Sequence, residues 1–394
     1  MLLYSFVAGI TVILATFVKK TEDKDRGLSR QRMLNGIILS ALFCILTALA
    51  ALRLEVGNDY GTYVVTAHEI FQRGFVVTER GFNFVVRLLY TLSGKEDHIL
   101  MFAVFGAAIV TVFLKTFKEQ SESFVLTFFL FMSLGIYFRT FNTVRYYFAL
   151  SIAVYSLKYL VDIKFATNSK AGIKSFIQAN NEELQDLIKF LVLIAIAALF
   201  HKSVLAVIPM YLICRLSLNK WVAMVLSAFG LGVLIFQNKI MEIVLILYPS
   251  YKNTIYIEES HSITENAPII LRCVLVLILR LACYREAIEH NRGNKLYFNM
   301  NFMAIGLYVF CYWLPLVTRF GYYLITPHIL LVPNVIMAVK DSEKKRRLIF
   351  VLIFIGIIYF TYFLFTATND GVRVLPYKSW LFYEKNWLNQ TDTF

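Results

Sequence analysis

The chain has 394 residues, of which 58% are hydrophobic and only 16% are charged, and its formal net charge is +13. Soluble domains carry roughly a quarter charged residues, whereas the mean hydropathy here is +0.63, so a soluble globular protein is excluded. A strongly basic chain can be a nucleic-acid binder, but this one has no basic arm and no base-stacking module. We therefore expect a membrane protein with no nucleic-acid partner.

Apolar runs recur along the whole chain and predict a single transmembrane domain over residues 1–394 with an all-helical, polytopic fold. The first run is followed rather than preceded by basic residues, which is typical of a retained span and not of a cleaved signal peptide. We expect about twelve transmembrane helices in all. Their predicted ranges are 2–18, 34–52, 98–114, 123–138, 144–161, 187–200, 203–214, 221–237, 267–284, 298–314, 321–339 and 348–366.

The basic residues gather in loops that the positive-inside rule assigns to the cytoplasm. The loop after the first span and the loop before the last are the most basic, so both are predicted to face inward. Both termini then face outward, together with the external loops 53–97 and 238–266. The basic residues that mark inside loops are Lys19, Lys20, Lys24, Arg26, Arg30, Arg32, Lys115, Lys118, Lys164, Lys170, Lys174, Arg285, Arg292, Lys295, Lys340, Lys344, Lys345, Arg346 and Arg347.

The run 187–214 is interrupted by His201-Lys-Ser203 and is too short for two full spans. A 14-residue helix rises only about 21 Å against a hydrocarbon core of about 30 Å. A single span here would invert all of the topology that follows and place the basic loop 340–347 outside. We therefore expect two short helices that meet at a turn, an arrangement that membranes tolerate where it lines a polar cavity.

The external loop 53–97 begins with Arg53-Leu-Glu-Val-Gly-Asn-Asp-Tyr-Gly-Thr-Tyr63, in which two glycines allow a turn around Asp59. Two interpretations are open. In the first, Asp59 is a base or a sugar-hydroxyl acceptor, and Arg53 holds an anion. In the second, Asp59 caps the following helix by accepting hydrogen bonds from its free backbone amides.

Apolar residues at 82, 85, 86, 89 and 92 repeat at helical spacing, which predicts an interfacial helix over 80–93 within this loop. Arg80, Asn83 and Arg87 fall on another face of that helix. Its arginines either snorkel to lipid headgroups or contact substrate.

Four arginines lie close to the hydrocarbon on the outer side, against the positive-inside bias. Arg139 and Arg145 flank the turn between two predicted spans, Arg319 repeats that pattern between two later spans, and Arg272 lies about one turn inside the outer end of its span. A guanidinium there is costly unless it meets an anion, and the paired oxygens of a diphosphate suit its planar fork. We predict a phosphate-bearing substrate, with snorkelling to the membrane surface as the alternative.

His201 lies at the predicted helix break, where it is either a hydrogen-bonded structural residue or a base in an outward cavity. The sequence has no outward Asp-x-Asp pair, no His-x-x-x-His and no glycine-rich phosphate loop. The five cysteines lie in or beside apolar runs without CxxC spacing, which is typical of buried thiols. We expect no metal and no cofactor, so arginines would neutralise a diphosphate.

Six short segments carry these polar residues, in the order Arg53…Gly57-Asn-Asp-Tyr-Gly-Thr-Tyr63, Glu79-Arg-Gly-Phe82, Asn142-Thr-Val-Arg145, Phe200-His-Lys-Ser203, Arg319-Phe-Gly-Tyr-Tyr323 and Leu375-Pro-Tyr377. Together they resemble the EpsG/Wzy-type polysaccharide polymerases, which have such segments in the same order. The ordered set spans about residues 50–380, nearly the whole chain. Asn58 and Tyr146 depart from the residues common in that family, which bears on the donor sugar.

The resemblance implies a glycosyltransferase of the bacterial inner membrane with a GT-C-like architecture and an outward-facing cavity. Such an enzyme joins oligosaccharide repeat units carried on undecaprenyl diphosphate at the outer, periplasmic face, and so lengthens a capsule, exopolysaccharide or O-antigen chain. Its partners would be the lipid-linked oligosaccharide, the growing polysaccharide and membrane lipid, with a chain-length regulator left open. Two other functions stay open: an O-antigen ligase, and a flippase, which needs no base and should show internal repeats that this sequence lacks.

This chemistry needs a base for the acceptor hydroxyl and stabilisation of the departing diphosphate. We expect a metal-independent single displacement, with Asp59 or His201 as the base and Arg145 as a catalytic diphosphate contact. The other substrate-binding candidates are Arg139 and Arg319 for the diphosphate, Arg53 and Arg272 as second choices, and Tyr60, Tyr63, Tyr322 and Tyr323 as hydroxyl-bearing surfaces for sugars.

Overall fold

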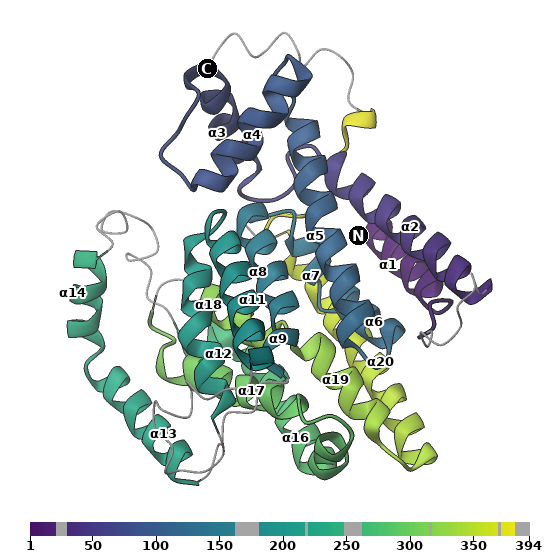
Figure 1. Ribbon diagram of the computed structural model, residues 1–394, viewed down its shortest axis with the longest axis vertical. Helices are drawn as coiled ribbons and strands as arrows, with labels where there is room; N and C mark the ends of the chain where they lie inside the picture. Colours follow the sequence, from purple (N-terminus) through teal and green to yellow (C-terminus); the bar gives the residue numbers. More distant parts are fainter. Residues whose placement is uncertain are drawn as a thin grey trace. The chain divides into compact units, whose positions relative to one another are not determined.

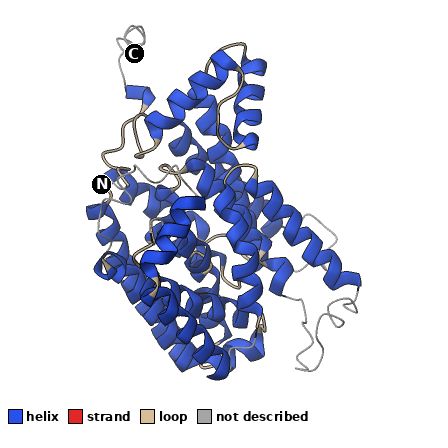
Figure 2. Cartoon of the chain, turned by 90° about the vertical axis from the view of Figure 1, so that its left-hand side faces the viewer, coloured by secondary structure: helices blue, strands red, loops and turns tan. Residues whose placement is uncertain are grey.

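The computed structural model is helical throughout its described part, which comprises residues 1–20, 30–161, 181–216, 220–247, 262–314, 317–368 and 372–382 (Figure 1). No strand occurs in these ranges, and the one isolated β-bridge within them joins Arg53 to Ser379. Figure 2 accordingly contains helices and loops only. The all-helical, polytopic fold class predicted from the apolar runs is confirmed.

The chain forms two compact units, each assembled from separate stretches of sequence. The first contains residues 1–155, 199–202 and 347–394, and the second contains 156–198 and 203–346. The helices of the first unit are α1 (Leu2–Ala15), α2 (Arg30–Ala51), α3 (Tyr60–Arg73), α4 (Arg80–Ser93), α5 (His98–Gln120), α6 (Phe124–Ser133), α7 (Ile136–Arg139), nearly all of α8 (Val144–Ser156), most of α20 (Ser342–Thr366) and η4 (Trp380–Phe382). Those of the second are α9 (Lys158–Val161), α11 (Asn181–Ala198), η1 (Lys202–Ala206), α12 (Val207–Arg215), α13 (Lys220–Ile235), α14 (Gln237–Leu247), η3 (Ile263–Asn266), α16 (Ala267–His290), α17 (Asn294–Phe310), α18 (Val317–Ile325) and α19 (His328–Ala338).

Five described helical segments are long and apolar enough to cross a membrane, and a sixth is added if the bent pair Trp221–Ile235 and Gln237–Ile243 forms one span. Both units contain such segments. The count of twelve is not confirmed, because several predicted spans coincide with helices such as α1, α6 and α12, of 14, 10 and 9 residues. A helix needs about 20 residues to cross a core of about 30 Å. The five segments are Arg30–Ala51, His98–Gln120, Ile263–His290, Val317–Ala338 and Ser342–Thr366.

Some sequence predictions fall on residues outside the described ranges. These include Lys24 and Arg26 of the first basic loop, and Lys164, Lys170 and Lys174 of a later one. Much of the predicted external loop 238–266 also lies there, although α14 covers its first part.

Aromatic side chains form the core of the first unit. The rings of Phe113, Phe117 and Phe131, from α5 and α6, lie 4.8 to 5.9 Å apart between centroids. Such ring pairs add about 0.5–1.5 kcal/mol each beyond the burial of their apolar area. Nearer the N-terminus of α5, Gly106 lets the helix approach α2, since a Cβ there would lie 2.8 Å from the Cβ of Ala50. These contacts pack α5 against α6 and α2, and α2 and α5 are the helices that precede and follow the predicted external loop 53–97.

The predicted external loop 53–97 contains two helices, α3 and α4, and the second coincides with the helix predicted over 80–93. Each ends at a glycine in the left-handed conformation, Gly74 after α3 and Gly94 after α4. The buried face of α4 carries Phe82, Val86 and Tyr90, and a second apolar row is exposed. That the external loop contains α3 as well was not predicted.

The chain breaks where the sequence predicts a break. Helix α11 ends at Ala198, the 3₁₀ segment η1 spans Lys202–Ala206, and α12 begins at Val207. His201 therefore lies between helices rather than within one, as expected from the interrupted apolar run.

The C-terminal segment 372–382 runs alongside the start of the external loop. The amides of Leu54 and Gly57 donate to the carbonyls of Lys378 and Arg373, both at 2.9 Å. The hydroxyl of Tyr377 donates to the Leu49 carbonyl at 2.9 Å. The first and last of the six sequence segments are therefore neighbours.

Candidate active site

A glycine joins the Asp59 turn to the segment that carries Arg145. Gly57 has φ +98°, and a Cβ there would lie 2.9 Å from the carbonyl carbon of Phe141, so neither the backbone conformation nor the space suits another residue. The Asp59 amide donates to Asn142 Oδ1 at 3.1 Å across 83 residues of sequence. Two of the six sequence segments are thereby held against each other.

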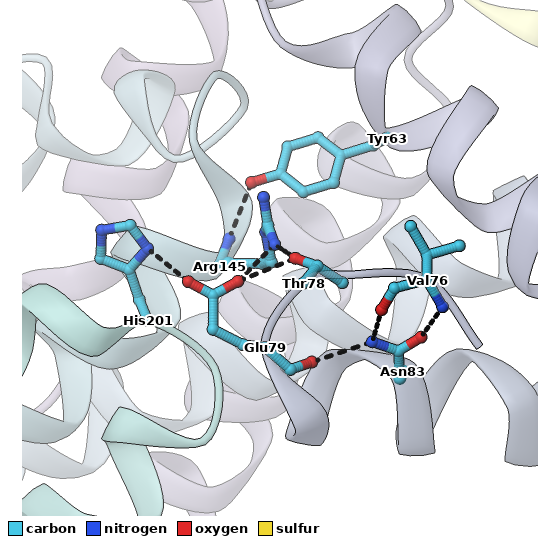
Figure 3. Close-up of polar contacts among 7 residues, drawn as sticks. All are labelled: Tyr63, Val76, Thr78, Glu79, Asn83, Arg145 and His201. Carbon is cyan, nitrogen blue, oxygen red and sulfur yellow. Dashed lines mark hydrogen bonds and ion pairs between the residues drawn. The ribbon is translucent and has the colours of Figure 1, made fainter. Parts of the chain in front are cut away.

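Arg145 lies in a pocket of aromatic and polar groups from α3 and α4 (Figure 3). Its guanidinium carbon is 5.4 Å from the ring centroid of Tyr63 and 5.2 Å from that of Phe82. Its Nη1 donates to Glu79 Oε2 at 2.5 Å and to the hydroxyl of Thr78, and its backbone amide donates to Tyr63 Oη at 3.2 Å. Cation–π contacts of this kind contribute about 0.5–2 kcal/mol. The direction of the guanidinium fork is therefore fixed by the surrounding protein.

Glu79 also faces His201. Its Oε1 lies 3.6 Å from His201 Nδ1, while its Oε2 accepts from Arg145, and the side chains of Glu79 and His201 are each 16% exposed. The ring of Tyr146 meets the imidazole edge to face, with centroids 5.3 Å apart. One carboxylate thus faces a guanidinium and an imidazole that are distant from it in sequence (Figure 3).

Backbone contacts hold Glu79 in this place. It is the N-cap residue of α4, with an extended backbone at φ −64° and ψ 135°. Asn83 fixes the loop before the helix, because its side chain accepts from the Val76 amide and donates to the Val76 and Glu79 carbonyls. The Gly81 amide donates to the Leu199 carbonyl at 2.8 Å, and a Cβ at Gly81 would come within 2.7 Å of that oxygen. The start of α4 and the chain just before His201 are therefore in direct contact.

Asp59 lies at the N-cap position of α3 but gives that helix no side-chain capping hydrogen bond. The capping interpretation of Asp59 is therefore not supported. The carboxylate acts on its neighbour instead: the pKa of Tyr63 is raised, chiefly by burial and further by the charge of Asp59, while Arg145 opposes the rise. Asp59 and Arg145 therefore act on Tyr63 with opposite signs.

Arg53 is enclosed rather than presented to a ligand. It is 2% exposed, its guanidinium carbon lies 4.1 Å from the Phe102 ring centroid and 5.3 Å from that of Phe141, and it donates to the Ala50 carbonyl. Burial lowers the pKa of Arg53 to about 10, so the group is still charged at neutral pH. Tyr60 stacks on the other side of this cluster, with its centroid 4.9 Å from that of Phe102.

The other predicted residue of the first unit, Arg139, ends α7. It is half-buried, and its guanidinium carbon lies 5.3 Å from the ring centroid of Phe363.

The second unit holds the remaining candidates. Arg319, Tyr322 and Tyr323 lie on α18, and Arg272 lies in the first turns of α16. Arg272, Arg319 and Tyr322 are half-buried, whereas Tyr323 is fully buried, with its hydroxyl 3.2 Å from Ser203 Oγ and its carbonyl accepting from the Tyr211 hydroxyl at 2.8 Å.

Sequence reasoning assigned no role to Glu79, although the segment Glu79-Arg-Gly-Phe82 was singled out. Helical periodicity could not identify it, because it precedes the first turn of α4. Within the described residues, no group of three or more His, Cys, Asp or Glu side chains is placed to hold a metal ion. The polar groups gathered here are instead the Glu79 carboxylate, the His201 imidazole and the Arg145 guanidinium.

Comparison with known proteins identifies the family. A family model described as the EpsG family matches residues 36–169 and 175–379, a range that includes every residue of the site. No curated protein and no solved structure matches the chain significantly. The chain belongs to the EpsG family, a membership that indicates a polysaccharide polymerase.

Proposed function

We propose that this chain polymerises undecaprenyl-diphosphate-linked oligosaccharide repeat units at the outer face of the bacterial inner membrane, by metal-independent glycosyl transfer. The observation that carries the proposal is the cluster of Glu79, Arg145 and His201 within one compact unit, with the Asp59 backbone held against the segment that carries Arg145. It combines two candidate bases with a guanidinium of fixed direction. Family membership supports the same class of reaction.

The reaction would be a single displacement at the anomeric carbon of the donor sugar. The acceptor oxygen forms a bond to that carbon, and the bond from that carbon to the diphosphate oxygen breaks with its electron pair on the leaving diphosphate. The acceptor proton passes to Asp59 or His201. Nη1 of Arg145 makes the contacts to Glu79 and Thr78, so the two hydrogens of Nη2 would donate to the diphosphate oxygens.

The other arginines divide by their burial. Arg139, half-buried in the first unit, would add to the diphosphate site; Arg319, half-buried in the second unit, stays a candidate diphosphate contact, with Arg272 as a second choice. Arg53 is too enclosed by Phe102 and Phe141 for a lipid-linked substrate, so we assign it to holding the base of the external loop. Its charge there is stabilised by aromatic faces rather than by an anion.

The tyrosines divide in the same way. Tyr322 is half-buried and would offer a flat hydroxyl-bearing surface to a sugar. Tyr60 and Tyr63 are 5% exposed or less, so they would shape the site from behind its surface, and Tyr323 is fully buried within the second unit.

The exposed side of α4 supports a place for the external loop at the outer membrane interface. Phe84, Leu88 and Leu92 are 67%, 44% and 75% exposed and follow one another at a spacing of four residues, beside Arg80 and Arg87. An apolar row flanked by arginines suits the boundary between headgroups and acyl chains. Twelve spans, a GT-C-like arrangement and an outward-facing cavity complete the proposal.

Purified protein in detergent, given lipid-linked repeat units and excess EDTA, tests the function. The expected product is a ladder of longer glycans, together with released lipid diphosphate. A flippase would make no new glycosidic bond and leave the substrate unchanged. A ligase would transfer the units to its own separate acceptor and make no ladder from repeat units alone. Loss of the ladder in EDTA, with recovery on adding Mg²⁺ or Mn²⁺, would contradict metal independence.

A further inference from the structure

Glu79 is the one charged side chain of the cluster to which the proposed reaction gives no task. Its two oxygens face different partners, Arg145 through Oε2 at 2.5 Å and His201 Nδ1 through Oε1 at 3.6 Å. Thr78 adds a hydrogen bond from its hydroxyl to Oε2 at 2.9 Å. The carboxylate is therefore held in place independently of His201.

We propose that Glu79 is a positioning residue for His201, which it holds with the proton on Nδ1, so that Nε2 is the base that takes the proton of the acceptor hydroxyl. The inference rests on the proposed glycosyl transfer and chooses between its two candidate bases. When the acceptor oxygen bonds to the anomeric carbon, its proton moves to Nε2, and the imidazolium that forms faces the Glu79 carboxylate. The electron pair of the broken bond leaves with the lipid diphosphate.

The orientation of the imidazole supports this assignment. Nδ1 is the ring nitrogen turned toward Glu79, and Nε2 is on the far side of the ring (Figure 3). A carboxylate beside one nitrogen of a neutral imidazole favours the tautomer with the proton on that nitrogen, which leaves the lone pair on the other. A distance of 3.6 Å is long for a hydrogen bond, but such contacts commonly shorten when substrate binds.

The backbone keeps the two side chains facing each other. Glu79 is two residues before Gly81, and His201 is two residues after Leu199, and the Gly81 amide donates to the Leu199 carbonyl at 2.8 Å. Phe200 lies between Leu199 and His201 in sequence, and its ring packs edge to face on that of Phe148 with centroids 4.7 Å apart. The hydrogen bond between Gly81 and Leu199 therefore keeps Glu79 and His201 close to each other.

The charges that face His201 set the sign of its titration. Glu79 favours the imidazolium, whereas Arg145 and the adjacent Lys202 disfavour it, and Tyr146 presents an uncharged ring edge. The same carboxylate is shared with Arg145. Removing the Glu79 charge would take away an anion that favours the imidazolium, so His201 would bind its proton less tightly.

The first test measures His201 itself. The full-length protein in detergent, with ¹³C-labelled histidine, is titrated by NMR, and the His201 resonance is assigned by its loss in His201→Gln. Glu79→Gln should lower the midpoint of the His201 titration by about one pH unit. Glu96→Gln is the matched control, because Glu96 Oε2 lies 2.8 Å from Nδ1 of His68 in the same unit, where His68 is 54% exposed. It should leave the midpoint of the His201 titration unchanged.

An unchanged His201 midpoint in Glu79→Gln would overturn the proposal, as would an equal change in Glu96→Gln. Glu79→Asp is the second variant, to be used if Glu79→Gln fails to fold. It keeps the carboxylate charge but moves it away from His201 by the length of one methylene group. It should give a smaller shift in the same direction. A midpoint for Glu79→Asp that does not move would count against the proposal in the same way.

The second test separates this inference from the proposed function. If polymerisation occurs, Glu79→Gln should slow it about ten-fold or more and move the acidic limb of its pH profile to lower pH. A slower reaction with the limb at its wild-type position would indicate a structural role only. If the wild type makes no polymer, the proposed function fails, while the NMR titration still decides whether Glu79 controls His201.

Discussion

Replacing Gly81 by alanine should separate the two halves of the candidate site with a single methyl group. A Cβ at this position would lie 2.7 Å from the Leu199 carbonyl oxygen and 2.9 Å from the Leu199 Cβ, where ordinary contact begins at 3.4 Å. The start of α4 and the chain at Leu199 would have to move apart by about 0.7 Å, with the hydrogen bond between them lengthened. Crowding of this kind costs about 1–3 kcal/mol.

Gly61→Ala is the matched control. Gly61 is the second residue of α3, as Gly81 is of α4, and a Cβ there would have no neighbour within 4 Å. The gain in helix propensity, at most about 1 kcal/mol, is therefore common to both variants and cancels in their difference.

Thermal unfolding in detergent, followed by tryptophan fluorescence at one scan rate, measures the stability difference. Gly61→Ala should melt at or slightly above the wild-type temperature, and Gly81→Ala should melt below it. Polymerisation should fall about ten-fold or more in Gly81→Ala, because the displacement separates Glu79 from His201, and an error of 1 Å in such a site can cost about 10²-fold. Equal melting temperatures and equal polymer yields for the two variants would refute the reasoning.

Three further outcomes are expected. Arg145→Lys keeps the charge but loses the planar fork, so polymerisation should fall by most of its value at an unchanged protein level; a normal polymer yield would favour snorkelling. Asp59→Asn and His201→Gln test the two bases: a loss of roughly 10²-fold in His201→Gln with a smaller loss in Asp59→Asn is expected, and the reverse order would make Asp59 the base. Single cysteines in a cysteine-free background test the topology with a membrane-impermeant reagent, which should label position 92 and not position 343 in intact cells; the opposite pattern would overturn the orientation.

The parts of the fold that local pattern controls could be predicted from sequence. The helix over 80–93 follows from its apolar spacing, and it ends where Gly94 adopts a left-handed conformation that favours glycine. The break before α12 follows from His201-Lys-Ser203, whose polar side chains interrupt an apolar run. Both features depend on neighbouring residues alone.

The parts that depend on distant contacts could not be predicted. Glu79 belongs to the site because its carboxylate pairs with Arg145, which is 66 residues away in sequence, and no helical periodicity connects the two. Arg53 reads as an exposed anion contact beside a polar turn, yet the rings of Phe102 and Phe141 enclose it. The count of twelve spans is not confirmed, because hydropathy marks an apolar run without revealing whether it forms a helix as short as the ten residues of α6.

The contacts of the C-terminal segment also determine the order in which the first unit can be completed. The hydroxyl of Tyr4 donates to the Val374 carbonyl at 2.7 Å, across 370 residues of sequence, and Lys378 pairs with Glu55 across 323. Closing so long a loop adds little to the equilibrium cost, because that cost grows only with the logarithm of loop length. The kinetic consequence is larger, since synthesis proceeds from the N-terminus. During synthesis the amides of Leu54 and Gly57 therefore lack their partners, the carbonyls of Lys378 and Arg373, until that late segment has left the ribosome.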